Sequence, residues 1–102
     1  MKSKTRKVLI GNASYGLWYG EIIDDAKTTK EIVACKAAVV RNCRHVRYWY
    51  GPTGGITSLA AQGPDPAKQN KIGAPCTALI TQIVNVFDVS SEAAARFDAV
   101  KA

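Results

Sequence analysis

Apolar residues in this chain come in short runs that are closed by glycine or by polar residues, a pattern typical of strands. The run at 5–12 ends at Gly11 and Asn12 and predicts a first strand. The aromatic segment 16–23 predicts a second strand, in which Gly20 indicates a bulge or a sharp bend. Polar residues 24–31 predict a hairpin turn. The segment 32–40 fits a strand or a short helix, and we favour the strand.

The second half of the chain predicts two more strands and two helices. The segment 45–50 (HVRYWY) is rich in aromatic and branched residues and reads as a strand. Residues 56–62 predict a two-turn helix that stops at Gly63, and 64–75 reads as a loop. The segment 76–89 predicts one long, bent strand. Ser90 is a suitable N-cap for a terminal helix, with Glu92 in its first turn and Lys101 in its last.

These elements predict a single domain over residues 1–102 that is mainly β, in the α+β class. About 100 residues enclose one hydrophobic core. Five strands with short connections, an internal helix and a C-terminal helix indicate a small, strongly bent antiparallel β-barrel of the SH3-like or Sm-like kind. Such barrels often cover their exposed edges by pairing with another subunit, so we expect a homo-oligomer.

The charge distribution points to an anionic partner. The net charge is +6, and between residues 32 and 87 the only acidic residue is Asp65, against six basic ones. Such a field favours a nucleotide, a nucleic acid or an acidic protein surface. A solvated basic surface that serves only solubility is the alternative. The N-terminus lacks the apolar run of a signal peptide, and no segment approaches a membrane span, so a cytoplasmic location is expected.

The sequence offers no recognised catalytic or metal-binding pattern. His45 is the only histidine and has no nucleophile at a known motif spacing, so we expect a contact residue and no enzyme. Cys35, Cys43 and Cys76 lack the close pairs of common zinc sites and are expected to be buried, reduced thiols. Neither a metal nor a cofactor is expected.

The segment 41–55 (RNCRHVRYWYGPTGG) combines arginines, aromatics and a glycine turn, and it is the predicted ligand site. Exposed aromatic rings can stack on a base, and a guanidinium can hold a phosphate in a bidentate way. Backbone N–H groups at the following helix start can also receive an anion. Alternatively, the aromatic residues cover a subunit interface or pack under the C-terminal helix. The candidate ligand-binding residues are Arg44, Arg47, Tyr48, Trp49, Gly54 and Gly55.

Several segments together resemble an uncharacterised family of small phage and prophage proteins. They are RKVLI, GLWYGEII, CRHVRYWYG, ITSLAAQGPDPAKQNKIGAPC and IVNVFDVSSEAAARF. Shared features are a β-hairpin, an R-x-[VI]-x-x-W strand, a glycine/alanine turn with a short helix, and a late strand that leads into a terminal helix. The resemblance implies a phage-encoded accessory protein in a bacterial cytoplasm.

Three functions remain open from the sequence. The first is a non-enzymatic protein that sequesters a phosphate-bearing ligand, such as a cyclic nucleotide signal of host immunity. The second is a structural virion protein, or a protein that binds a host protein. The third is nucleic-acid binding by an Sm-like barrel, which predicts a strong salt dependence.

Overall fold

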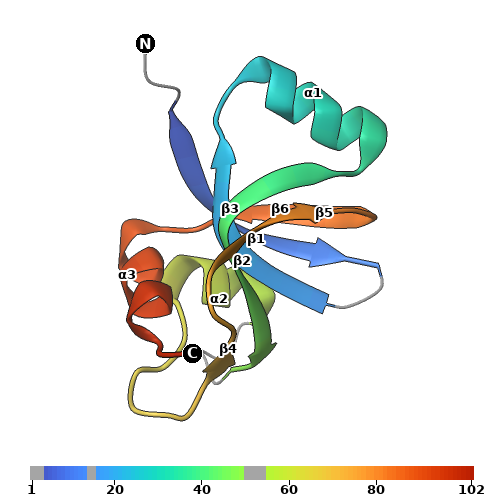
Figure 1. Ribbon diagram of the computed structural model, residues 1–102. Coiled ribbons are helices and arrows are strands. Elements are labelled where there is room, and N and C mark those ends of the chain that lie inside the picture. The colour runs from blue at the N-terminus through green and yellow to red at the C-terminus, as the bar shows by residue number, and fades with distance from the viewer. Residues whose placement is uncertain (1–3, 14–15, 50–54) are drawn as a thin grey trace.

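The computed structural model describes residues 4–13, 16–49 and 55–102, which form a curved sheet with three helices (Figure 1). All strand pairs are antiparallel, and the sheet order is β4-β3-β2-β1-β6, with β5 also paired to β3. The elements in chain order are β1 (Thr5–Asn12), β2 (Gly16–Ile23), α1 (Ala26–Cys35), β3 (Ala38–Tyr48), α2 (Ile56–Gln62), β4 (Lys71–Ile72), β5 (Cys76–Ile80), β6 (Ile83–Asp88) and α3 (Ser91–Ala99).

The mainly β architecture with helices agrees with the prediction, but the sheet does not close into a barrel. In the described part of the chain, β5 pairs only with β3 and β6 pairs only with β1. These two strands follow each other in sequence and yet lie at opposite edges of the sheet. The predicted SH3-like or Sm-like barrel is therefore not supported, and the fold is an open, strongly curved sheet.

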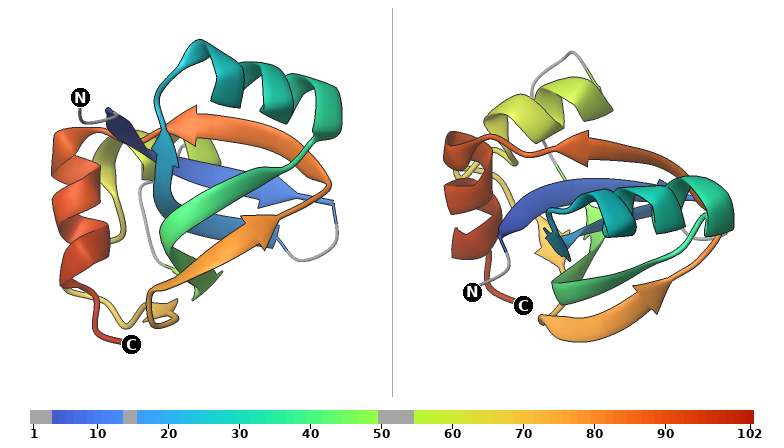
Figure 2. Two further views of the ribbon diagram at one scale, coloured as in Figure 1. Left: turned by 45° about the horizontal axis from the view of Figure 1, so that its top comes forward. Right: turned by 90° about the horizontal axis from the view of Figure 1, so that it is seen from above.

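Both faces of the sheet carry a hydrophobic core, because side chains alternate along each strand. Val8 and Ile10 of β1 belong to one core and Leu9 between them to the other, and all three are fully buried. The core on the face of Leu9 also holds Leu59 of α2 and Phe97 of α3. The other core is formed where the sheet curves over itself, and α1 lies away from the other two helices (Figure 2). The sheet is thus covered by α2 and α3 on one face, and on the other by its own curvature together with Ile32 of α1.

The pairing of β2 with β3 is irregular at Gly20, where the sequence predicted a bulge or a sharp bend, although the extra residue is on β3. The pairing of β2 with β3 shifts register between Tyr19 and Glu21. On β3 the extra residue falls next to Asn42, whose φ of 50° lies in the left-handed region. A bulge of this kind bends and twists a strand. The predicted bend is confirmed, and it lets the first half of β3 pair with β5 and the second half with β4.

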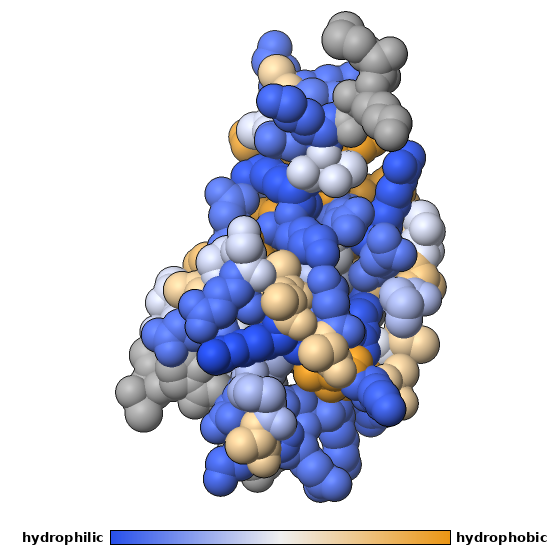
Figure 3. Space-filling model, turned by 90° about the vertical axis from the view of Figure 1, so that its left-hand side faces the viewer, coloured by the Kyte–Doolittle hydropathy of each residue, from blue (hydrophilic) through white to orange (hydrophobic). Residues whose placement is uncertain are grey.

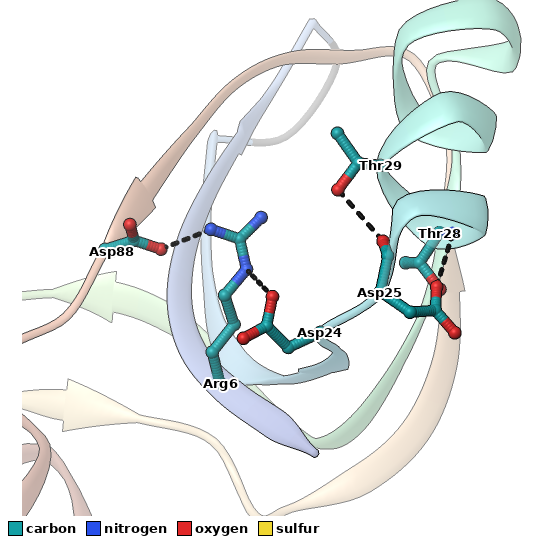
Figure 4. Close-up of polar contacts among 6 residues, drawn as sticks. All are labelled: Arg6, Asp24, Asp25, Thr28, Thr29 and Asp88. Atoms are coloured by element: carbon teal, nitrogen blue, oxygen red, sulfur yellow. Dashed lines mark hydrogen bonds and ion pairs between the residues drawn. The ribbon is translucent and has the colours of Figure 1, made fainter. Parts of the chain in front are cut away.

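The predicted hairpin turn at 24–31 is wrong, because helix α1 begins there. Asp25 is the N-cap, and its side chain accepts a hydrogen bond of 2.7 Å from the Thr28 backbone N–H (Figure 4). The helix continues to Cys35 and ends where Lys36 adopts a left-handed conformation, so the favoured strand at 32–40 starts only at Ala38. Aspartate is common both in turns and at helix N-caps, so the polar segment is compatible with a turn and with the start of a helix.

The Asp25 cap gives α1 an expected pH dependence. The hydrogen bond from Thr28 lowers the pKa of Asp25 below its usual value. A lowered pKa in the folded state means that the stabilisation is complete above the unfolded pKa of about 3.9 and is lost as pH falls through the folded value. Hydrogen-exchange protection of the α1 amides should therefore decline below about pH 4. Asp25→Ala should remove that protection at neutral pH, whereas Asp24→Ala should retain it.

Arg6 of β1 forms ion pairs with two aspartates that lie near the ends of neighbouring strands. Its Nη1 lies 2.6 Å from Oδ1 of Asp88 in β6, and its Nε lies 3.9 Å from Oδ1 of Asp24 (Figure 4). These are partly exposed pairs, each of which contributes about 0–1 kcal/mol. They link β1 to its neighbour β6 and to the residue that follows its other neighbour, β2.

The two helices predicted in the C-terminal half are confirmed, but strand β4 lies within the segment 64–75 that we predicted to be a loop. Helix α2 ends at Gly63 as expected, and the Ser90 hydroxyl accepts a hydrogen bond of 3.0 Å from the Ala93 N–H at the start of α3. The expected long strand at 76–89 is broken into β5 and β6 at Gln82, whose φ is 54°. Because α3 ends at Ala99, Lys101 lies beyond its last turn.

Helix α3 packs on the sheet through an apolar face. Phe97 is fully buried, and its ring stacks on that of Tyr19 with centroids 4.5 Å apart. The outer surface on this side of the molecule is mostly hydrophilic (Figure 3). None of the described helices is long and apolar enough to cross a lipid bilayer.

Candidate anion-binding site

Arg44 is a buried arginine whose guanidinium group joins two distant segments of the chain. Its side chain lies between β4 and the end of α3, and the residue is only 6% exposed. Nε donates to the Gly73 carbonyl at 2.7 Å, and Nη1 donates to the Phe97 carbonyl at 2.7 Å. Nη2 donates to the carbonyls of Val100 at 2.5 Å and Ile72 at 3.4 Å. All three guanidinium nitrogens therefore bond to backbone oxygens of the protein itself.

These contacts give Arg44 a structural role that the sequence did not indicate. Carbonyl groups in the last turn of a helix lack partners within the helix and carry partial negative charge. The Phe97 carbonyl also accepts from the Val100 N–H at 3.2 Å, and the guanidinium adds a second donor there and interacts favourably with the helix dipole. The contact with a ligand phosphate that we predicted for Arg44 would require these bonds to break, so we do not retain Arg44 as a ligand contact.

The two segments that Arg44 joins form the walls of a small basic pocket. Its volume is about 270 Å³. Arg47, Lys71 and Lys101 all line it, and each of these residues is exposed. Ile72, which is buried, provides an apolar part of the lining. Among the described residues, no acidic side chain lines this pocket. The remaining lining residues are Asn70, Gly73 and Ala102.

Local structure explains how Arg47 and Lys71 come together. Val46 pairs with Ile72 and Tyr48 with Lys71, so Arg47 is the extra residue of a β-bulge in β3. The loop before β4 is shaped by Asp65, whose carboxylate accepts a hydrogen bond of 2.9 Å from the Ala67 N–H. The Asp65 carboxylate therefore bonds within its own loop and is not among the described residues that line the pocket. The bulge and this loop bring Arg47 of β3 and Lys71 of the neighbouring strand β4 to one pocket.

Of the other predicted ligand residues, Trp49 and Gly55 are described, and neither is among the described residues that line this pocket. Trp49 is half-buried and packs against the core beneath α2 and α3, which agrees with the alternative of packing under the C-terminal helix. Tyr48 is the last residue of β3, and its backbone pairs with Lys71. Gly55 is exposed at the start of α2, with a φ of 80°. Gly54 lies outside the described residues.

Sequence reasoning missed two of the three cations. Both lysines are distant from Arg47 in sequence, Lys71 by 24 positions and Lys101 by 54. Neither lysine belongs to a motif, and Lys101 was assigned to the last turn of a helix that ends before it. The only signal was the excess of basic residues in the middle of the chain, which does not specify a location.

A second pocket on the molecule contains charges of both signs. It has a volume of about 300 Å³ and is lined by residues that include Lys7, Glu21 and Asp98. Lys7 Nζ lies 2.7 Å from Asp98 Oδ2, and the Tyr19 hydroxyl donates to Asp98 Oδ1 at 2.9 Å. Burial and the neighbouring Asp98 raise the pKa of Tyr19, so its phenol stays protonated. Because Lys7 is paired with Asp98 and Glu21 adds a further negative charge, this pocket is less suited to an anionic ligand.

Neither the histidine nor the cysteines form a metal site in the described part of the chain. No group of three or more histidine, cysteine, aspartate or glutamate residues is placed there to hold a metal ion. His45 stacks on Trp18 with ring centroids 4.3 Å apart. Of the cysteines, Cys43 is buried, but Cys35 and Cys76 are exposed, which corrects the expectation of three buried thiols.

Comparison with known proteins identifies the family. A family model described as "Domain of unknown function (DUF6948)" matches residues 5–97, which is most of the chain. The chain therefore belongs to this family. No curated protein and no solved structure shows a significant match.

Proposed function

We propose that this member of the DUF6948 family binds a small phosphate-bearing ligand in the basic pocket. The observation that supports the proposal is the convergence of Arg47, Lys71 and Lys101 around one cavity, with no acidic side chain among its described lining residues. Three cations that repel one another gain stability when an anion lies between them. Binding is the proposed role, and it requires no chemical step.

The pocket suits a phosphate group with a compact organic part. Arginine offers a planar pair of N–H donors to phosphate oxygens, whereas lysine acts as a mobile point charge. The volume of about 270 Å³ is just below the range of about 300–1,000 Å³ that is usual for small-ligand sites. The apolar surface of Ile72 can contact the non-phosphate part of the ligand. A nucleotide fits this description if its base extends beyond the cavity, so nucleotides are the ligand class that we propose.

Sequestration is the biological role that we attach to such binding. A protein that sequesters a nucleotide signal leaves the nucleotide chemically unchanged. It needs affinity for the nucleotide but no catalytic group. The resemblance to small phage proteins suggests this role, together with a bacterial host. It predicts that bound nucleotide is recovered intact after the protein is denatured, which chromatography of the released ligand would check.

Titration calorimetry with ADP and with pyrophosphate tests the pocket. We expect saturable binding at one site that weakens as ionic strength rises. A variant with Arg47→Gln, Lys71→Gln and Lys101→Gln should bind about 30-fold more weakly, taking about 0.7 kcal/mol for each exposed charge contact. Its thermal stability should be nearly unchanged, since all three residues are exposed.

A matched control separates the pocket from overall charge. Lys4→Gln, Lys27→Gln and Lys30→Gln together remove the same three charges from exposed positions outside the pocket. This variant should bind nearly as tightly as the natural sequence. Equal loss in both variants would show that the net charge attracts anions without a site, and no saturable binding by the natural protein would remove the proposal.

A further inference from the structure

Cys43 and Cys76 lie directly opposite each other on neighbouring strands. They are partners in the antiparallel pairing of β3 with β5, next to the bulge at Asn42. Side chains of directly opposed residues point to the same face, with Cβ atoms about 4.5–5.5 Å apart. A disulfide requires a Cβ separation of about 3.5–4.5 Å. The two ranges meet at about 4.5 Å, so a shift of the edge strand β5 by about 1 Å or less would place a directly opposed pair within the range for a disulfide.

The two thiols have different environments. Cys43 is 1% exposed and packs in the core formed by the curvature of the sheet. Burial raises the pKa of Cys43 to about 11, and the nearby Cys76 contributes to the increase. Cys76 is exposed at the first residue of β5. A soluble oxidant therefore reaches Cys76 first, while Cys43 is protected from direct attack.

We propose that Cys43 and Cys76 form a reversible disulfide when the protein meets hydrogen peroxide. In the first step the Cys76 sulfur attacks one peroxide oxygen, the O–O bond breaks, and Cys76 becomes a sulfenic acid while the other oxygen leaves as water. In the second step the Cys43 sulfur attacks the Cys76 sulfur. The S–O bond breaks, and the hydroxyl leaves as water with the proton of the Cys43 thiol. Two thiols are oxidised, and one hydrogen peroxide is reduced to two waters.

The crosslink would close a loop that contains most of the basic pocket. Arg47 and Lys71 lie between the two cysteines in sequence, as does α2. The bond would also attach β5 covalently to the only strand that it pairs with among the described residues. A crosslink over a loop of this length restricts the unfolded chain and stabilises the folded state. The inference rests on the cysteine geometry and is independent of ligand binding.

Peroxide treatment of the folded, full-length protein tests the proposal. After alkylation of free thiols, mass spectrometry should show a monomer two hydrogens lighter, one alkylated cysteine at Cys35, and a peptide pair joined through Cys43 and Cys76. Oxidation should raise the Tm by about 5 °C or more. Dithiothreitol should reverse both changes. The Cys35→Ser variant should behave in the same way, because Cys35 lies on α1 and has no part in the pair.

Two variants make the result decisive. Cys76→Ser changes an exposed residue, so it should fold normally and show neither the crosslink nor the rise in Tm. Cys43→Ser should leave Cys76 to accumulate as sulfenic and then sulfinic acid. The proposal fails if the natural protein gives only overoxidised Cys76 with free Cys43. It also fails if the only disulfide joins two chains through Cys35 or Cys76.

Discussion

Replacement of Arg44 with methionine is expected to lower the free energy of unfolding by about 3–5 kcal/mol. The substitution keeps an unbranched apolar stem but removes the donors to four backbone carbonyls. A buried acceptor that loses its partner costs about 1–3 kcal/mol, and the total stability of a domain of this size is about 5–15 kcal/mol. Urea denaturation followed by circular dichroism would measure the loss.

A matched arginine on the same strand provides the control. Arg41 also lies on β3 but is exposed, so Arg41→Met should change stability by no more than about 0.5 kcal/mol. Arg44→Lys should give an intermediate loss, since it keeps a positive charge near the end of α3 but cannot reach all four carbonyls. Equal, small effects of Arg41→Met and Arg44→Met would contradict the structural role of Arg44.

The same substitution should also affect the basic pocket without touching a ligand. Three of the four carbonyls held by Arg44 belong to Ile72 and Gly73, which line the pocket, and to Val100, which precedes Lys101. Loss of the guanidinium would separate the segments that carry Lys71 and Lys101. Arg44 is in this sense a positioning residue, and weaker binding by Arg44→Lys under conditions where that variant is fully folded would demonstrate it.

Arg44 also shows why the fold was easier to predict than the site. Strands such as β1 and the cap of α3 depend on residues that are close in sequence, and these were predicted correctly. The role of Arg44 depends on carbonyls up to 56 positions away, for which the sequence has no signal. Arginine next to aromatic residues is typical of a ligand site, but here the surrounding backbone binds the guanidinium.

Two errors in the predicted elements have physical reasons of the same kind. Helix α1 has no buried residue, and residues 27–31 are all polar, so its first half carries no apolar signal by which a helix is recognised. The break between β5 and β6 occurs at Gln82, a residue type with no preference for the left-handed conformation that it adopts. Because β6 pairs with β1 instead of continuing from β5, the sheet formed by the described strands does not close.

Replacement of Gly20 with alanine should be the most damaging change of one methyl group in the sheet. A Cβ atom at Gly20 would lie 2.4 Å from Cγ1 of Val40, 3.0 Å from the Arg41 carbonyl oxygen and 3.1 Å from Cα of Cys43. Val40 is fully buried and has little room to move. Overpacking of a core typically costs about 1–3 kcal/mol, and a cost at the upper end, about 3 kcal/mol, is expected because backbone atoms are also involved.

Gly73→Ala is the control, since its Cβ would meet nothing closer than 3.7 Å. It should be neutral or slightly stabilising, because alanine reduces the freedom of the unfolded chain.

A double-mutant cycle with Val40→Ala can separate the two causes of the Gly20 effect. Removal of the Val40 methyl groups relieves the closest contact but leaves those with the backbone at Arg41 and Cys43. Gly20→Ala should therefore cost less in the Val40→Ala background than in the natural sequence, and still cost more than Gly73→Ala. Full relief by Val40→Ala would show that the valine side chain alone requires glycine. A persistent cost would locate the requirement in the close approach of β2 to the bulge of β3, the bend that allows one strand to pair with both β5 and β4.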